Sequence, residues 1–80
     1  MGKEEILETL TRILRDLLAD ESLILKASTR RSDVPDWDSF SYVNFIVAIE
    51  LQYDLKFSVA EVESFENVGE IAERIVELSM

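Results

Sequence analysis

The sequence contains no cysteine and no histidine. Without cysteine there can be no disulfide and no thiolate nucleophile, and without histidine the commonest general base and metal ligand is missing. These two absences exclude zinc sites built on thiolate or imidazole, and they exclude Cys-His and Ser-His nucleophilic pairs. Carboxylates alone could act as acid and base, but no spacing in the sequence identifies a buried pair. We therefore do not expect an enzyme.

Basic residues are scarce as well: 8 lysines and arginines stand against 17 aspartates and glutamates, which gives a net charge of −9. Nucleic acids and anionic membranes attract basic surfaces, so neither is an expected partner, whereas proteins with basic docking surfaces are. No apolar run approaches the roughly 18 residues of a membrane-spanning helix, and no basic start followed by an apolar run suggests a signal peptide. We expect a cytoplasmic protein with no membrane span.

What the sequence does contain is enough apolar residues for one small core. Of its 80 residues, 48% are hydrophobic and 31% are charged, a composition too apolar for a disordered tail. A chain of this length buries only about 60% of its unfolded surface, so the core must be small. We expect a single domain over residues 1–80.

Helical periodicity is the dominant pattern in the first half of the chain. Residues 3–19 place apolar residues at helical spacing, namely Ile6, Leu10, Ile13, Leu14 and Leu17. Residues 20–37 show no sustained period, although five side chains could pin this segment to a core: Leu23, Ile24, Leu25, Val34 and Trp37. A connection this long in so small a domain is usually functional or mobile.

A second helix is expected from Ser39 to about Tyr53, with Asp38 as its N-cap, and it is apolar on two sides. At about 100° per residue, its core face comprises Tyr42, Phe45, Ile46, Ile49 and Tyr53. On roughly the opposite side lies a second set, called the apolar stripe below: Phe40, Val43, Val47 and Leu51. Either the preceding loop folds over the apolar stripe, or the stripe is exposed and contacts a partner.

Two further capping patterns mark the last two helices. Ser58 followed by Glu61 has the pattern of a capping box and introduces a short helix. Asn67 with Glu70 repeats that logic before a final helix, whose buried stripe is expected to be Val68, Ile71, Ala72, Ile75 and Leu78. The prediction is an all-α fold: a small four-helix bundle of three long helices and one short one, with a long loop between the first and second helices.

Ser39, at the junction of that loop and the second helix, has three interpretations. It could simply be a tolerated residue of the first helical turn. The nearby aspartates could instead bind calcium, but the calcium-loop template fails, since Phe40 occupies a ligand position and Val47 replaces the bidentate glutamate. In the third interpretation the Ser39 hydroxyl carries a covalent group, because a phosphodiester would be well placed beside free backbone N–H groups at a helix start.

The stretch DWDSFSYVNFIVAIELQYDLKFS resembles the attachment region of acyl carrier proteins and the related peptidyl carrier domains. Their shared motif is Asp-Ser-Leu at the start of the second helix, and here Phe40 stands in place of the leucine. The resemblance extends over nearly the whole chain, from the first amphipathic helix to the fourth, and includes the aromatic-aspartate pair Tyr53-Asp54 and the acidic charge. It implies that Ser39 bears 4′-phosphopantetheine and that Asp38 is the aspartate that precedes it in the motif.

The resemblance also implies a function: to carry acyl or aminoacyl intermediates as thioesters in a fatty-acid, polyketide, nonribosomal peptide or related pathway. A phosphopantetheinyl transferase would modify Ser39 with coenzyme A and magnesium, and the carrier, a monomer, would meet a loading enzyme and downstream synthases or transferases. Past Asp38, the second-helix region holds only two acids, Glu50 and Asp54. This indicates a specialised, stand-alone carrier whose partners recognise the apolar stripe more than charge. The alternative is an unmodified interaction module that uses the stripe as a permanent interface.

Trp37, two residues before Ser39, also has two interpretations. It could be a hydrophobic plug that ties the end of the loop to the bundle. Alternatively, it could lie beside the phosphopantetheine arm and shape what the arm carries.

Overall fold

The computed structural model describes residues 2–79, and the regular structure in this range is entirely helical. In chain order the elements are α1 (Lys3–Leu18), the short 3₁₀ helix η1 (Arg31–Asp33), α2 (Ser39–Tyr53), α3 (Val59–Ser64) and α4 (Val68–Leu78). The predicted all-α fold, with three long helices, one short helix and a long first loop, is confirmed; η1 was not predicted. Within residues 2–79 no helix is both long and apolar enough to cross a membrane.

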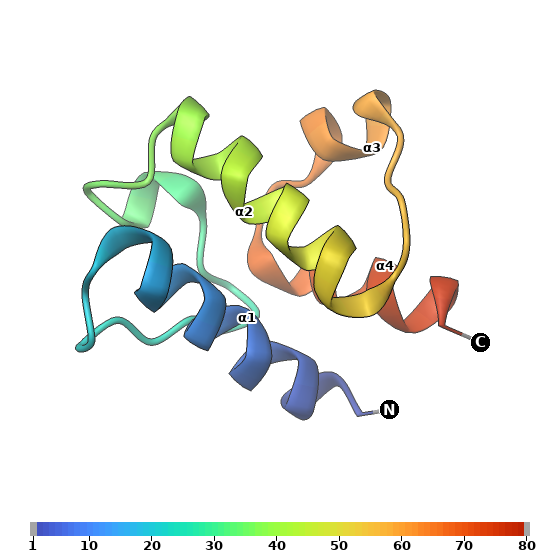
Figure 1. The fold of residues 1–80 in the computed structure, drawn as a ribbon, viewed down its shortest axis with the longest axis horizontal. Coiled ribbons are helices and arrows are strands. Elements are labelled where there is room, and N and C mark those ends of the chain that lie inside the picture. Colours follow the sequence, from blue (N-terminus) through green and yellow to red (C-terminus); the bar gives the residue numbers. More distant parts are fainter. Residues whose placement is uncertain (1, 80) are drawn as a thin grey trace.

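The helix α1 is the centre of the packing, because it contacts both α2 and α4. Figure 1 shows α1 and α2 running along the same diagonal, with the long connection between them at one end of the molecule and both chain termini at the other. The buried core draws on all three long helices and on the connection, and its fully buried large side chains are Phe45, Ile6, Leu10, Leu14, Ile49, Ile71, Ile75 and Val68.

Three predicted core residues are exposed. Leu17 in the last turn of α1 and Leu78 at the end of α4 are 42% and 37% exposed, because helical spacing sets the side that a residue faces but not whether a neighbour covers that turn. Ile24 is 65% exposed while the next residue, Leu25, is buried. Neighbouring side chains of an irregular, extended segment point in different directions, so only one of the pair reaches the core.

The connection between α1 and α2 follows a fixed course. Leu25, Val34 and Trp37 are buried, as predicted. Close to α4, the backbone of this segment accepts two hydrogen bonds, from Gly69 N to the Ala27 oxygen at 2.8 Å and from Val68 N to the Thr29 oxygen at 2.9 Å. These attachments hold the segment that leads into the first turn of α2.

The caps predicted for α3 and α4 are present. Ser58 Oγ accepts a hydrogen bond from Glu61 N at 3.1 Å, and Asn67 Oδ1 accepts one from Glu70 N at 2.9 Å. The short helix α3 buries no residue of its own fully. Its backbone is joined to α2 by the Tyr42 hydroxyl, which donates to the Val62 oxygen at 2.7 Å.

Candidate functional site

The first turn of α2 begins where the sequence predicts. Asp38 lies in an extended conformation just before the helix, and its Oδ1 accepts a hydrogen bond from Ser41 N at 2.8 Å. Ser39 is the first helical residue and is exposed to solvent. The structure therefore presents the Ser39 hydroxyl openly at the positive end of a 15-residue helix, next to a capping carboxylate.

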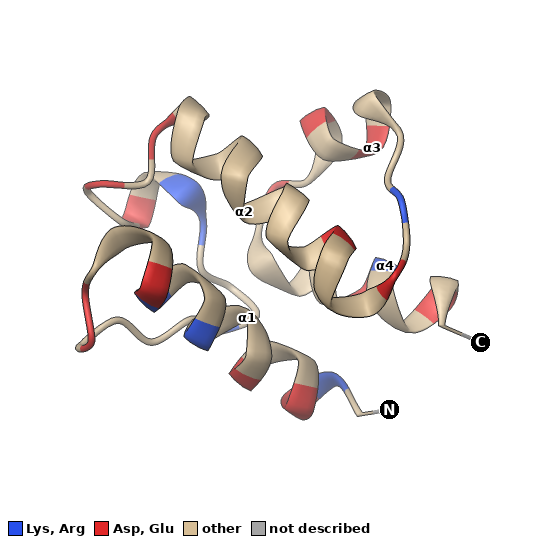
Figure 2. Cartoon of the chain, viewed as in Figure 1, with Lys and Arg blue, Asp and Glu red and all other residues tan. Residues whose placement is uncertain are grey.

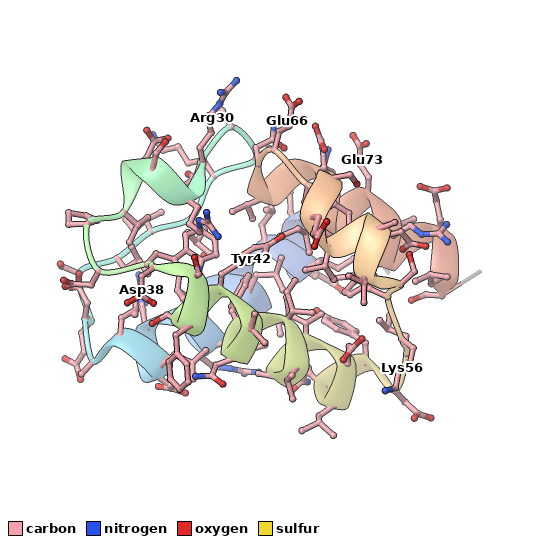
Figure 3. The ribbon with its side chains drawn as sticks, turned by 90° about the horizontal axis from the view of Figure 1, so that it is seen from above. Arg30, Asp38, Tyr42, Lys56, Glu66 and Glu73 are labelled. Carbon is pink, nitrogen blue, oxygen red and sulfur yellow. The ribbon has the colours of Figure 1, made fainter. Side chains whose placement is uncertain are left out.

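The electrostatics of this turn favour a charged Asp38 and involve a cation from the loop. Hydrogen bonds from Ser41 hold the pKa of the Asp38 carboxyl below its usual value, and the positive charge of Arg31 adds to the effect. The Arg31 guanidinium carbon lies 5.2 Å from the centre of the Tyr42 ring, within the range of a cation–π contact. Burial raises the pKa of Tyr42. Figure 3 shows Asp38 just before the start of α2 and Tyr42 on its first turns.

Trp37 packs as a plug between the loop and α2. It is 4% exposed, and its ring meets the Phe45 ring edge-on with centres 5.2 Å apart and lies 6.0 Å from the Tyr42 ring. Its Nε1 is buried and has no hydrogen-bond partner among the described residues. The plug interpretation is confirmed, whereas a role for Trp37 in shaping a bound arm stays a prediction.

The apolar stripe of α2 is uncovered. The exposed fractions are 74% for Phe40, 54% for Val43, 46% for Val47 and 80% for Leu51. The loop does not fold over these side chains, so that alternative is wrong. Residues 39–53 include no lysine or arginine and a single acid, Glu50, whose Oε2 accepts a hydrogen bond from Phe57 N at 2.9 Å. Figure 2 shows α2 as the long helix with the fewest charges. The surface next to Ser39 is thus apolar rather than acidic.

The surroundings of Ser39 fit a phosphodiester on its hydroxyl. The side chain is open to solvent, no acid other than Asp38 adjoins it in the sequence, and helix starts favour anionic groups. Within residues 2–79 no three acidic side chains come together in a way that could hold a metal ion.

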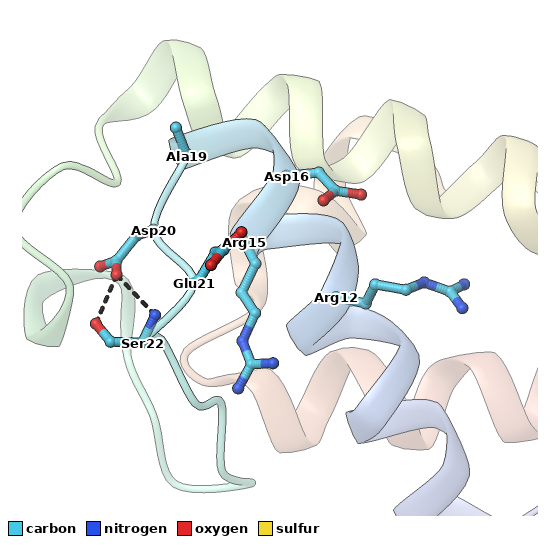
Figure 4. A pocket seen from close by; sticks show the side chains of 7 residues that line it. All are labelled: Arg12, Arg15, Asp16, Ala19, Asp20, Glu21 and Ser22. Atoms are coloured by element: carbon cyan, nitrogen blue, oxygen red, sulfur yellow. Dashed lines mark hydrogen bonds between the residues drawn. The ribbon is translucent and has the colours of Figure 1, made fainter.

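A hollow at the end of α1 offers no comparable chemistry (Figure 4). Three of its polar side chains are engaged locally: Asp20 Oδ1 accepts from Ser22 Oγ at 2.6 Å and from Ser22 N at 3.1 Å, and Arg15 Nε donates to the Leu23 oxygen. The Arg12 and Arg15 side chains point in different directions. No set of donors converges there on a ligand.

The sequence analysis missed Arg31. The sequence does not single out this residue, because no spacing rule connects a loop arginine to a tyrosine eleven positions later. Its contact with the Tyr42 ring depends on how the loop returns to α2.

Comparison with known proteins relates the chain to a solved structure. No family model matches the chain, and no curated protein matches it. Among solved structures, the fold matches the solution NMR structure of a holo acyl carrier protein from Geobacter metallireducens with a TM-score of 0.82. The two chains are 37% identical, and the match covers 89% of this chain and 82% of the other.

Proposed function

The chain belongs to the acyl carrier protein family, and from this premise we propose that it carries acyl or aminoacyl groups on 4′-phosphopantetheine attached to Ser39. The observation that supports the site is the exposed Ser39 hydroxyl on the first residue of α2, directly after the capping Asp38. Residues 1–80 would act as one carrier domain and not as an enzyme. Its relative from Geobacter metallireducens is a holo protein, which supports the same modification here.

Each residue of the site has a definite part in this proposal. In the modification, Ser39 Oγ would form a bond to the phosphorus that bears the pantetheine. The pyrophosphate P–O bond of coenzyme A would break, its nucleotide half would leave, and the hydroxyl proton would pass to a base of the transferase or to water. Asp38 would fix the first turn of α2, and with it the position of Ser39, by accepting the Ser41 N–H. When bound, phosphopantetheine supplies the thiol that forms a thioester, and the polypeptide itself has no cysteine to do so.

The work of such a carrier is delivery. A tethered group reaches a partner's active site at a high effective concentration, which a free intermediate does not. Docking must be weak and transient, since the same carrier visits a transferase, a loading enzyme and a downstream synthase. Weak docking is consistent with a small contact surface such as one face of α2.

We propose that partners dock on the apolar stripe. It begins at Phe40, one residue after the attachment site, and continues along α2 on the same side. Because α2 carries one acid and no base, recognition would depend on apolar contact more than on charge. This would distinguish a specialised carrier from a carrier that its partners recognise through rows of acids.

The stripe is tested with a broad-specificity phosphopantetheinyl transferase as the partner. Val43→Glu should slow modification of Ser39 about fivefold or more, since a central contact is worth over about 1 kcal/mol. Ile24→Glu, an equally charged change on an exposed apolar residue of the loop, should leave the rate unchanged. Equal rates for the two variants would refute docking on the stripe.

The attachment site is tested by intact mass after incubation with coenzyme A, magnesium and the same transferase. The wild type and Ser41→Ala should each gain one phosphopantetheine, and Ser39→Ala should gain none. Because Ser39 is exposed, Ser39→Ala should melt close to the wild type. Modification of Ser39→Ala would place the arm elsewhere, and a large loss of stability would indicate that Ser39 has a structural role.

The exposed stripe also supports a second candidate, an unmodified module that uses the stripe as a permanent interface. Light scattering separates the two functions. A carrier should be a monomer over a wide concentration range. A tight oligomer that takes no phosphopantetheine would favour the module.

A further inference from the structure

Arg31 lies beside the turn that holds the attachment serine. Its guanidinium carbon is 5.2 Å from the centre of the Tyr42 ring, and Tyr42 is three residues after Ser39 on α2. Side chains three apart on a helix are neighbours, and they lean toward the helix N-terminus. The Tyr42 ring, and the Arg31 guanidinium over it, therefore lie toward the turn that contains Ser39.

The platform under Arg31 is firmly held. The Tyr42 hydroxyl donates to the Val62 oxygen at 2.7 Å, and one side of the ring packs near the buried Trp37. A guanidinium held over an aromatic ring still carries N–H groups that can donate hydrogen bonds. The planar edge of a guanidinium matches the oxygens of a phosphate group.

The charge of Arg31 is not used in an ion pair. Among the ion pairs within residues 2–79, none includes Arg31, although the chain carries a net charge of −9. Asp33 Oδ2 accepts from the Arg30 N–H, and Asp38 Oδ1 accepts from the Ser41 N–H. Arg31 does act on Asp38 through space, since its charge contributes to the lowered pKa of that carboxyl after the hydrogen bonds from Ser41. A cation is thus held near Ser39 without a bonded carboxylate.

We propose that Arg31 is a positioning residue that binds the phosphodiester on Ser39 and directs the arm along the Tyr42 side of α2. This rests on the proposed modification of Ser39 and adds a residue to it. At about 100° per residue, Tyr42 lies on a different side of α2 from the apolar stripe. An arm held by Arg31 would leave the stripe free for a partner, so the same helix could present the cargo and the docking surface separately.

The test compares two neighbouring arginines in the unmodified and modified protein. Arg31→Gln removes the proposed contact, and Arg30→Gln removes the same charge from a side chain that points away from Asp38 and Tyr42 (Figure 3). The melting temperature of each protein is measured before and after modification. Relative to the wild type, Arg31→Gln should lower the melting temperature of the modified protein by about 2–4 °C more than that of the unmodified protein. Arg30→Gln should change the melting temperatures of the unmodified and modified protein equally.

A second readout observes the phosphodiester itself. Its ³¹P resonance in the modified wild type should move as sodium chloride is raised, because salt weakens the contact, and in Arg31→Gln it should start near the high-salt position. Arg31→Lys keeps the charge but loses the planar edge, so its ³¹P resonance should lie between those of the modified wild type and of Arg31→Gln.

The outcomes separate the inference from the function on which it rests. If Arg31→Gln lowers the melting temperature of both forms equally and leaves the ³¹P resonance unchanged, Arg31 only stabilises the folded protein or the charge of Asp38 and does not contact the phosphodiester. If Arg30→Gln has the same effect as Arg31→Gln, the contact is not specific. In either case the protein is still modified, so only the inference is refuted. If the wild type gains no phosphopantetheine by mass, the proposed function fails and the inference fails with it.

Discussion

Gly69 in the first turn of α4 is a position where two effects of one methyl group oppose each other. In a helix, alanine is favoured over glycine by about 1 kcal/mol, so Gly69→Ala would be expected to stabilise the protein on propensity alone. The structure predicts the opposite. A Cβ at residue 69 would lie 2.7 Å from the backbone oxygen of Ala27 and 3.1 Å from the Ala27 Cβ.

The loss of stability depends on which atoms a Cβ at residue 69 would displace. The obstacle at 2.7 Å is backbone, and the same oxygen accepts the hydrogen bond from Gly69 N at 2.8 Å. Overpacking of this kind costs about 1–3 kcal/mol, and weakening one hydrogen bond costs about 0.5–1.5 kcal/mol. These terms exceed the gain in helix propensity, so Gly69→Ala should destabilise the fold by about 1–3 kcal/mol.

The assay is thermal unfolding followed by far-UV circular dichroism. A domain of this size loses about 4–8 °C of melting temperature for each kcal/mol, so a loss of about 1–3 kcal/mol should make Gly69→Ala melt roughly 4–24 °C below the wild type. The matched control is Gly2→Ala, because a Cβ at the other glycine of the chain would meet nothing within 4 Å. The control should stay within about 0.5 kcal/mol of the wild type. A Gly69→Ala protein as stable as the wild type, or more stable, would refute the reasoning.

Two further predictions concern α2. Hydrogen bonds from Ser41 lower the pKa of Asp38, so its carboxylate stabilises the fold above the pKa of the unfolded chain, and this stability is lost as pH falls through the folded pKa. In urea unfolding from neutral pH to about pH 2, Asp38→Asn should lose less stability on acidification than the wild type; identical pH profiles would contradict this. Tyr42→Phe removes the donor to the Val62 oxygen, so it should cost about 1 kcal/mol and speed amide hydrogen exchange in α3, and unchanged exchange would show that this bond does not hold the helix.

The start of α2 could be predicted because its signals are local. Asp38 caps the helix by a hydrogen bond to a residue three positions away, and the same short-range rule identifies Ser58 and Asn67. The family resemblance read from the residues around Ser39 is confirmed by a solved structure that matches most of the chain. What the resemblance implies for the Ser39 hydroxyl remains a proposal until its modification is measured.

Whether a neighbouring segment covers an apolar side chain was harder to predict than the side of the helix on which that side chain lies. Leu17 and Leu78 follow the helical period of the core and are exposed because they lie at helix ends. The apolar stripe could be covered by the loop or exposed to a partner, and the helical period of α2 does not distinguish these alternatives. The choice depended on the path of the connecting loop, which buries Trp37 and runs beside α4 instead of crossing the stripe.

The sequence by itself determined α1, α2, α3 and α4, the caps of the last three, and the position of Ser39, because each depends on residues within one or two turns of one another. Only the tertiary structure decided that the apolar stripe remains exposed and that Arg31, which is in no ion pair within residues 2–79, lies near Tyr42. The close approach of Ala27 to Gly69 and the cation–π contact of Arg31 with Tyr42 join residues that are not neighbours in the chain. Contacts of this kind exist only after α1, α2 and α4 have packed around one core and fixed the course of the loop between them.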